Sequence, residues 1–276
     1  NASADVPKYV HNFNGMRNQT QKIQETSFYR YGRERFYLFP ALKNRSEGGA
    51  FFAFGPQFEA VKIRRDSAHF LSGELPADVR PEVFDWQYFA GGKLEFRYTN
   101  VENAWNPDRG VRFLTEIGIL SNLEQARRVH FRIGGSLTVY LPLDPAQNLV
   151  VASKAGGEAI AGKFDFFQAA KLGGQESLRG FASERFSGRV MLFHNLELRW
   201  KAIDRERLRI PISAGIAPAF DYGRVFWEGE NFELTDWHFS YGGGIWIAPL
   251  DVAALSLNVM RSKEGQRFTF KIGFGF

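Results

Sequence analysis

Apolar and polar residues alternate along most of this chain, and the alternation continues to the last residue. The clearest run sets Val129, Phe131, Ile133, Gly135, Leu137, Val139 and Leu141 against His130, Arg132, Gly134, Ser136, Thr138 and Tyr140. The final run sets Phe268, Phe270, Ile272, Phe274 and Phe276 against Thr269, Lys271, Gly273 and Gly275. Successive side chains of a β-strand point to opposite faces, so each run predicts a strand with one apolar face. The chain is therefore predicted to be all-β.

The predicted strands are typical of a barrel in a bilayer. No apolar run approaches the roughly 20 residues that a membrane-spanning helix requires. A closed barrel can cross with strands of about ten residues whose alternate side chains face the lumen. The mean hydropathy of −0.29 agrees with this pattern. Aromatic residues, 16% of the chain, would form the girdles at the two membrane interfaces.

We count about twelve antiparallel strands in one domain. Residues 28–276 are assigned to the barrel, and residues 1–27 to a linker or a weak first strand. Phe36, Leu38, Pro40 and Leu42 predict one strand, and a hairpin turn over 44–49 leads into the next. Residues 64–84 contain two prolines and no steady period, which indicates a long loop.

The alternation is interrupted once by Leu172-Gly173-Gly174-Gln175-Glu176-Ser177-Leu178-Arg179-Gly180-Phe181. Its glycines disfavour both a helix interior and a packed strand, so we interpret it as a structured loop. Five predicted strands follow it. Glu197 and Asp221 lie on the polar faces of two of these strands. The alternation of apolar and polar residues therefore predicts that both carboxylates point into the barrel.

The loop and its flanks resemble the outer-membrane protein assembly and two-partner translocation superfamily, the BamA-, TamA- and FhaC-like barrels of the bacterial surface antigen type. In that family a long extracellular loop folds into the lumen and carries a Val/Leu-Arg-Gly-Phe/Tyr motif. Leu178-Arg179-Gly180-Phe181 matches this motif at each position, and Pro107-Asp108-Arg109-Gly110 resembles a Pro-x-Arg-Gly turn of the same family. The resemblance implies a location in the bacterial outer membrane.

The resemblance also implies roles for single residues. Arg179 would be held by Glu197, in a strand like the family's Glu-bearing strand, and by Asp221, in a strand like its Phe-x-Asp-x-Gly strand. A guanidinium forms a planar fork of donors that suits carboxylates. Gly173, Gly174 and Gly180 would let the loop approach the wall, and Phe181 would pack against it. The terminal Phe276 resembles the C-terminal signal by which the assembly machinery recognises barrels.

Two departures from the family bear on function. The assembly factors and translocases close about sixteen strands, and this chain contains no POTRA repeats. The chain begins at Asn1 with neither initiator Met nor signal peptide, so we expect a mature or excised piece. The barrel is thus expected to serve either as a gated translocation or insertion barrel, or as the anchor of an N-terminal hydrolase of the patatin-like or metallophosphoesterase-like kind.

Other functions are less well supported. The five histidines have no metal-binding spacing, so no metal and no cofactor are expected. An outer-membrane phospholipase would need a His-x-Ser-Asn-Gly pattern, which is absent, and the chain itself is not expected to be an enzyme. A passive porin function would not explain the Leu178–Phe181 motif or its two acidic partners. The net charge of +5 is scattered, which disfavours nucleic acid. Expected partners are outer-membrane lipid and lipopolysaccharide, the assembly machinery and a polypeptide substrate; a homodimer stays open.

Overall fold

The computed structural model describes residues 2–5, 10–65, 69–71, 75–103, 106–205, 211–230, 235–249 and 254–272. Within these ranges the helical segments are three short 3-10 turns, η1 (Thr26–Tyr29), η2 (Pro81–Phe84) and η3 (Phe166–Gln168). No helix of the described residues is long and apolar enough to cross a membrane. The strands are β1 (Ala2–Asp5), β2 (Val10–Asn12), β3 (Arg30–Leu38), β4 (Leu42–Arg45), β5 (Ala50–Arg64), β6 (Gln87–Val101), β7 (Gly110–Asn122), β8 (Val129–Pro142), β9 (Leu149–Gly162), β10 (Ala170–Leu172), β11 (Phe186–Gly188), β12 (Val190–Arg205), β13 (Ile212–Phe226), β14 (His238–Pro249), β15 (Leu255–Ser262) and β16 (Gly265–Ile272).

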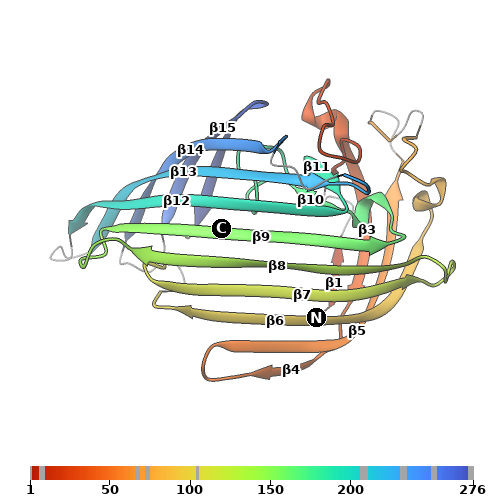
Figure 1. The fold of residues 1–276 in the computed structure, drawn as a ribbon, viewed down its shortest axis with the longest axis horizontal. Helices are drawn as coiled ribbons and strands as arrows, with labels where there is room; N and C mark the ends of the chain where they lie inside the picture. Colours follow the sequence, from red (N-terminus) through yellow and green to blue (C-terminus); the bar gives the residue numbers. More distant parts are fainter. Residues whose placement is uncertain are drawn as a thin grey trace.

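One antiparallel sheet contains nearly all of these strands (Figure 1). Its path runs β1-β3-β5-β6-β7-β8-β9-β12-β13-β14-β15-β16, while β2 pairs with β3 and β4 with β5. Twelve strands therefore follow one another, which confirms the expected all-β antiparallel fold. The short strands β10 and β11, which come between β9 and β12 in the sequence, pair with each other in a separate sheet.

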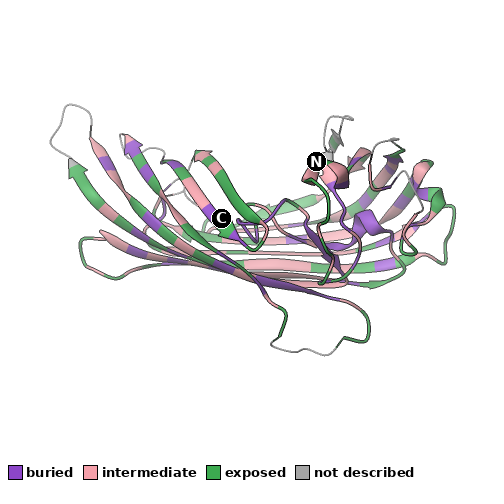
Figure 2. Ribbon diagram, turned by 90° about the horizontal axis from the view of Figure 1, so that it is seen from above, coloured by how far each residue is buried: buried purple, intermediate pink, exposed green. Residues whose placement is uncertain are grey.

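The sheet is curved but not closed among the described residues. Figure 2 shows it as an open trough, with the segment that contains β10 and β11 on the concave side. The first edge consists of β1 and β2, which pair with β3, and the last edge is β16, which pairs with β15. Residues 6–9 and 273–276 lie outside the described ranges.

Burial follows the predicted alternation. On β8, Phe131 is 42% exposed and Leu141 is 55% exposed, whereas His130 and Tyr140 are 2% exposed. These lumen-facing side chains of β8 are thus buried, and the convex face is apolar. Moving an exposed Leu or Phe side chain out of water stabilises by about 1.5–3 kcal/mol. The convex face therefore suits the hydrocarbon of a bilayer.

Two sequence-based boundaries differ from the structure. The run over Phe36 to Leu42 is split, because β3 ends at Leu38 and β4 begins at Leu42, and both pair with β5. Pro40 lies in the break, where it has no N–H to donate to a ladder. Opposite it, Gly55 approaches so closely that an added Cβ would lie 2.1 Å from the Pro40 carbonyl oxygen. The long loop before β6 also ends in the 3-10 turn η2.

The antiparallel order places the longer connections at one end of the sheet. We call this the loop end; its described residues are 13–29, 65, 69–71, 75–86, 123–128, 163–189, 227–230 and 235–237. Side chains from several of these segments share a core that includes Phe13, Val83 and Phe166. The rings of Phe13 and Phe166 lie 4.6 Å apart between centroids. The loop end is therefore covered by packed side chains.

Candidate functional site: the lumen loop

The connection between β9 and β12, residues 163–189, is the lumen loop. It enters through η3, forms the β10–β11 hairpin and makes its tip from residues 173–185. Gly173 and Gly174 have φ of +125° and +85°, which L side chains rarely adopt. A Cβ on Gly180 would lie 2.5 Å from the Cβ of Ser240. The three predicted glycines thus permit the turn and the close approach to the wall.

The structure brings Arg179 together with both predicted carboxylates. Its Nε donates to Asp221 Oδ1 at 3.0 Å, one terminal nitrogen lies 2.6 Å from the same oxygen, and the other donates to Glu197 Oε2 at 2.7 Å. The backbone N–H of Arg179 donates to Asp221 Oδ2 at 3.0 Å. All three residues are buried: Arg179 is 8% exposed, Glu197 6% and Asp221 0%.

A second arginine pairs with Glu197. Arg199, one of the residues that sequence reasoning missed, donates from Nε to Glu197 Oε1 at 2.8 Å and also reaches the carbonyl of Pro107. Two arginines therefore face two carboxylates. Burial would lower the pKa of Arg179, but the hydrogen bonds and charges of Asp221 and Glu197 raise it above its ordinary value. The guanidinium stays charged.

Apolar contacts hold the loop tip beside the ion pairs. Leu178 is fully buried and Phe181 is 1% exposed, and both pack in a cluster with Leu172, Phe186, Phe193 and Val225. The ring of Phe186 stacks on His238 of β14 at 3.8 Å between centroids. The motif residues on either side of Arg179 thus anchor the tip through burial.

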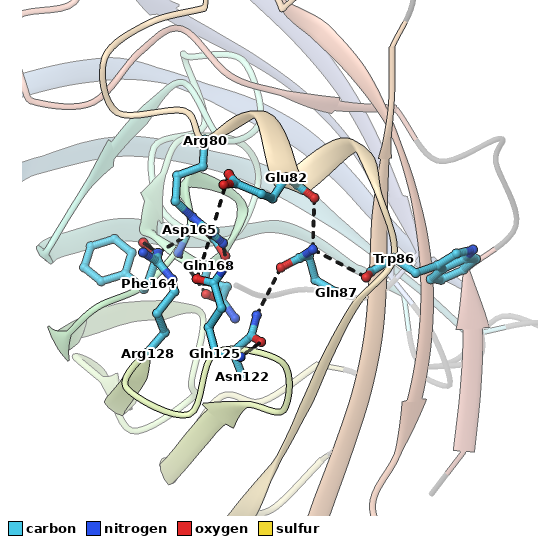
Figure 3. Close-up of polar contacts among 10 residues, drawn as sticks. All are labelled: Arg80, Glu82, Trp86, Gln87, Asn122, Gln125, Arg128, Phe164, Asp165 and Gln168. Carbon is cyan, nitrogen blue, oxygen red and sulfur yellow. Dashed lines mark hydrogen bonds and ion pairs between the residues drawn. The ribbon is translucent and has the colours of Figure 1, made fainter.

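The root of the loop is fixed by a second cluster that the sequence did not predict (Figure 3). The Asp165 carboxylate accepts two hydrogen bonds from Arg80, at 2.7 and 2.9 Å, and one from Arg128 at 3.1 Å. Asp165 also forms a capping box with Gln168 at the start of η3. Beside this cluster, Asn122 donates to Gln87 at 3.0 Å. Three loops are therefore joined through one buried carboxylate.

A charged cavity of about 480 Å³ lies between the loop and the wall formed by β3 to β9. Opposite charges on neighbouring strands meet there: Arg35 with Glu59 at 2.8 Å, Lys93 with Glu116 at 3.0 Å, and Arg132 with Glu158 at 2.6 Å. Lys171 and Glu184 of the loop also line it. Burial would raise the pKa of Glu184, but Lys171 and His11 lower it to about 2. The lumen thus has a polar interior beside the loop.

The convex face contains one pair of interest for catalysis. His194 Nε2 lies 2.9 Å from Ser153 Oγ, and because β12 and β9 supply one residue each, sequence spacing does not reveal the contact. A catalytic Ser–His pair needs a group that orients the histidine. The buried Nδ1 of His194 has no hydrogen-bond partner in the described parts of the chain. We therefore assign this pair no catalytic role.

Two further expectations concern assembly and metals. Phe276 lies outside the described residues, although Phe268, Phe270 and Ile272 of β16 are exposed on the convex face as predicted. Among the residues that the structure describes, no three His, Asp or Glu side chains form a group that could hold a metal ion.

Comparison with known proteins agrees with the fold. A sequence model of the Omp85 superfamily domain matches residues 13–276, nearly the whole chain. The chain belongs to the Omp85 superfamily. Its location is therefore the bacterial outer membrane, and the resemblance seen in the loop motif is confirmed.

Solved structures show the same fold. The crystal structure of BamA from Haemophilus ducreyi lacking POTRA domains 1-3 superimposes with a TM-score of 0.62 at 18% identity, covering 89% of this chain and 54% of that one. CdiB from Escherichia coli gives a TM-score of 0.53 at 11% identity, covering 90% and 46%. This chain thus spans about half the length of each of these Omp85 structures. No curated protein sequence matches the chain.

Proposed function

We propose that this Omp85 domain is a gated barrel for the passage or membrane insertion of a polypeptide, and that the lumen loop is its plug. The observation that supports the proposal is that Arg179 pairs with two carboxylates. Its guanidinium joins the loop tip to Asp221 on β13 and to Glu197 on β12. A loop that only covered the surface would not need a buried fork of this kind.

The energetics favour a closed resting state. Removing one partner from a buried ion pair typically costs about 3–5 kcal/mol, because a charge is left without a counter-charge. Withdrawal of the loop would separate Arg179 from two carboxylates and expose Leu178 and Phe181. Passage of a polypeptide therefore requires a compensating interaction, which the substrate or a partner protein would supply.

An anchor is the second candidate. The chain covers 54% of the BamA structure and 46% of the CdiB structure, so about half of each of those chains has no counterpart here. In this role the barrel would hold an N-terminal soluble domain, such as a patatin-like or metallophosphoesterase-like hydrolase. The same ion pairs would then be permanent. The two candidates differ in whether the loop ever leaves the lumen.

Ion conductance in planar bilayers tests the plug. We expect the wild-type barrel to be closed and a variant lacking residues 173–185 to conduct steadily. Arg179→Ala should open intermittently, while Arg97→Ala, a lumen arginine with one hydrogen bond to Glu95, should stay closed. A wild type that is steadily open, and unchanged by the deletion, would contradict the proposal and favour a passive porin.

The proposed partners follow from the same role. They are outer-membrane lipid and lipopolysaccharide on the convex face, the outer-membrane assembly machinery at the C-terminal strand with Phe276, and a polypeptide substrate. Nucleic acid is not among them, and a homodimer is left open. In cells, an anchor would tolerate a covalent tether between loop and wall, whereas a gated barrel would lose its activity.

A further inference from the structure

The lumen loop contacts both free edges of the sheet. The first edge consists of β1 and β2, and the last edge is the β15–β16 hairpin. Among the described residues these edges do not pair with each other. Two consecutive loop residues, Glu184 and Arg185, lie between them. Each contacts a different edge through a charged side chain.

Glu184 holds the first edge. Its Oε1 lies 2.9 Å from Nδ1 of His11 on β2, and its Oε2 accepts a hydrogen bond from Lys171 at 2.7 Å. The backbone beside it makes two more contacts: Asn12 Nδ2 donates to the Ser183 carbonyl at 2.9 Å, and the Arg17 N–H donates to the Ser187 carbonyl at 2.8 Å. The loop thus lies against the chain that leaves β2.

Arg185 holds the last edge. Its Nε donates to Oε1 of Glu264, in the turn between β15 and β16, at 2.7 Å. Its terminal nitrogens donate to the hydroxyl and the carbonyl of Thr20, at 2.8 and 2.6 Å, so this arginine also reaches the segment after β2. Ser262 of β15 donates to the Gly180 carbonyl at 2.8 Å. Arg185 is 2% exposed, which makes an unpaired state costly.

We propose that Glu184 and Arg185 form a clamp that joins the first and last edges of the sheet at the loop end. The Arg179 fork differs from this clamp, since Asp221 and Glu197 lie on neighbouring strands of the same side of the opening. Arg179 fixes the loop to β12 and β13. The clamp connects the same loop to the edge strands on both sides of the opening. The two edges therefore cannot separate at the loop end while the clamp is intact.

Spin-label distances across the opening test the clamp. The chain has no cysteine, so Ser3→Cys on β1 and Gln266→Cys on β16 would take labels uniquely. Pulsed electron paramagnetic resonance on the full chain in lipid vesicles should give a narrow distribution for the wild-type background. Glu184→Gln with Arg185→Gln should shift the distribution to longer distances and broaden it.

A single charge in the same loop provides the control. Arg189→Gln removes a loop arginine whose partner Glu228 lies on neither edge. This control should keep the wild-type distribution; broadening equal to that of the clamp variant would overturn the proposal. Should the clamp variant fail to assemble, Glu264→Gln tests the same contact from the hairpin and should broaden the distribution. A wild-type distribution in Glu264→Gln would likewise overturn the clamp.

Discussion

Arg179 connects two strands through one guanidinium, so its effect on stability should exceed that of an ordinary ion pair. Arg179→Ala would leave Asp221, which is fully buried, and Glu197 with fewer counter-charges. We expect a loss of about 3–5 kcal/mol. The folded band on cold-versus-boiled gels should disappear at a clearly lower temperature. Arg97→Ala, whose side chain is 52% exposed, serves as the comparison and should change the transition little. Equal transitions for both variants would argue against the pairing.

Gly180 is the second residue on which the position of the loop tip depends, because there is no room for a side chain between it and the wall. An added Cβ would meet the Cβ of Ser240 at 2.5 Å and the Arg261 backbone at 3.2 Å. Gly180→Ala should therefore push the loop tip from the wall, weaken the neighbouring Arg179 contacts and lower the same gel transition by a few degrees. Gly118→Ala on β7, where the nearest atom would lie at 3.6 Å, is the matched control. A wild-type transition in Gly180→Ala would mean that the tip is less closely fitted than its geometry indicates.

At the scale of elements, the strands were predictable because lipid and lumen impose a period of two on each of them. The same reasoning failed where the backbone departs from that period. Pro40 continues the apolar face of Phe36 and Leu38 in the sequence, yet it interrupts the pairing because it has no N–H. The sequence also did not predict the cluster of Arg80, Arg128 and Asp165 at the root of the lumen loop, because these residues lie in segments with no periodicity.

That cluster gives a prediction for the loop end. Asp165→Asn keeps the shape of the side chain but leaves Arg80 and Arg128 facing a neutral amide. The loops should then separate more often, and trypsin should cleave after Arg128 faster than in the wild type. Glu228→Gln, which removes the exposed partner of Arg189, should leave that rate unchanged. If both variants are cleaved at the wild-type rate, the three loops must be held together mainly by the apolar core around Phe166.

At the scale of the whole molecule, the motif predicted which residues meet but not how the loop relates to the two sheet edges. Leu178 to Phe181 could be selected by family resemblance, and Glu197 and Asp221 by resemblance and parity together. Glu184 and Arg185 carried no such signal. Their partners His11, Thr20 and Glu264 lie far away in the sequence, and opposite charges at such separations match in many ways. Only the fold decides which of these pairs form.

Assembly depends on the end of the chain. Phe268, Phe270 and Ile272 expose 72%, 64% and 66% of their surfaces on the convex face of β16, and the same parity extends to Phe276. We expect deletion of Phe276 to reduce the amount of folded barrel in the outer membrane, because a machinery that recognises the last strand would lose its terminal aromatic contact. Phe58→Ala, on the same face of β5 and 43% exposed, removes a comparable apolar surface elsewhere. It should assemble nearly as the wild type does. Quantifying the heat-modifiable band in isolated membranes separates the two cases. Full insertion without Phe276 would show that the strand is recognised through its backbone and its remaining apolar face.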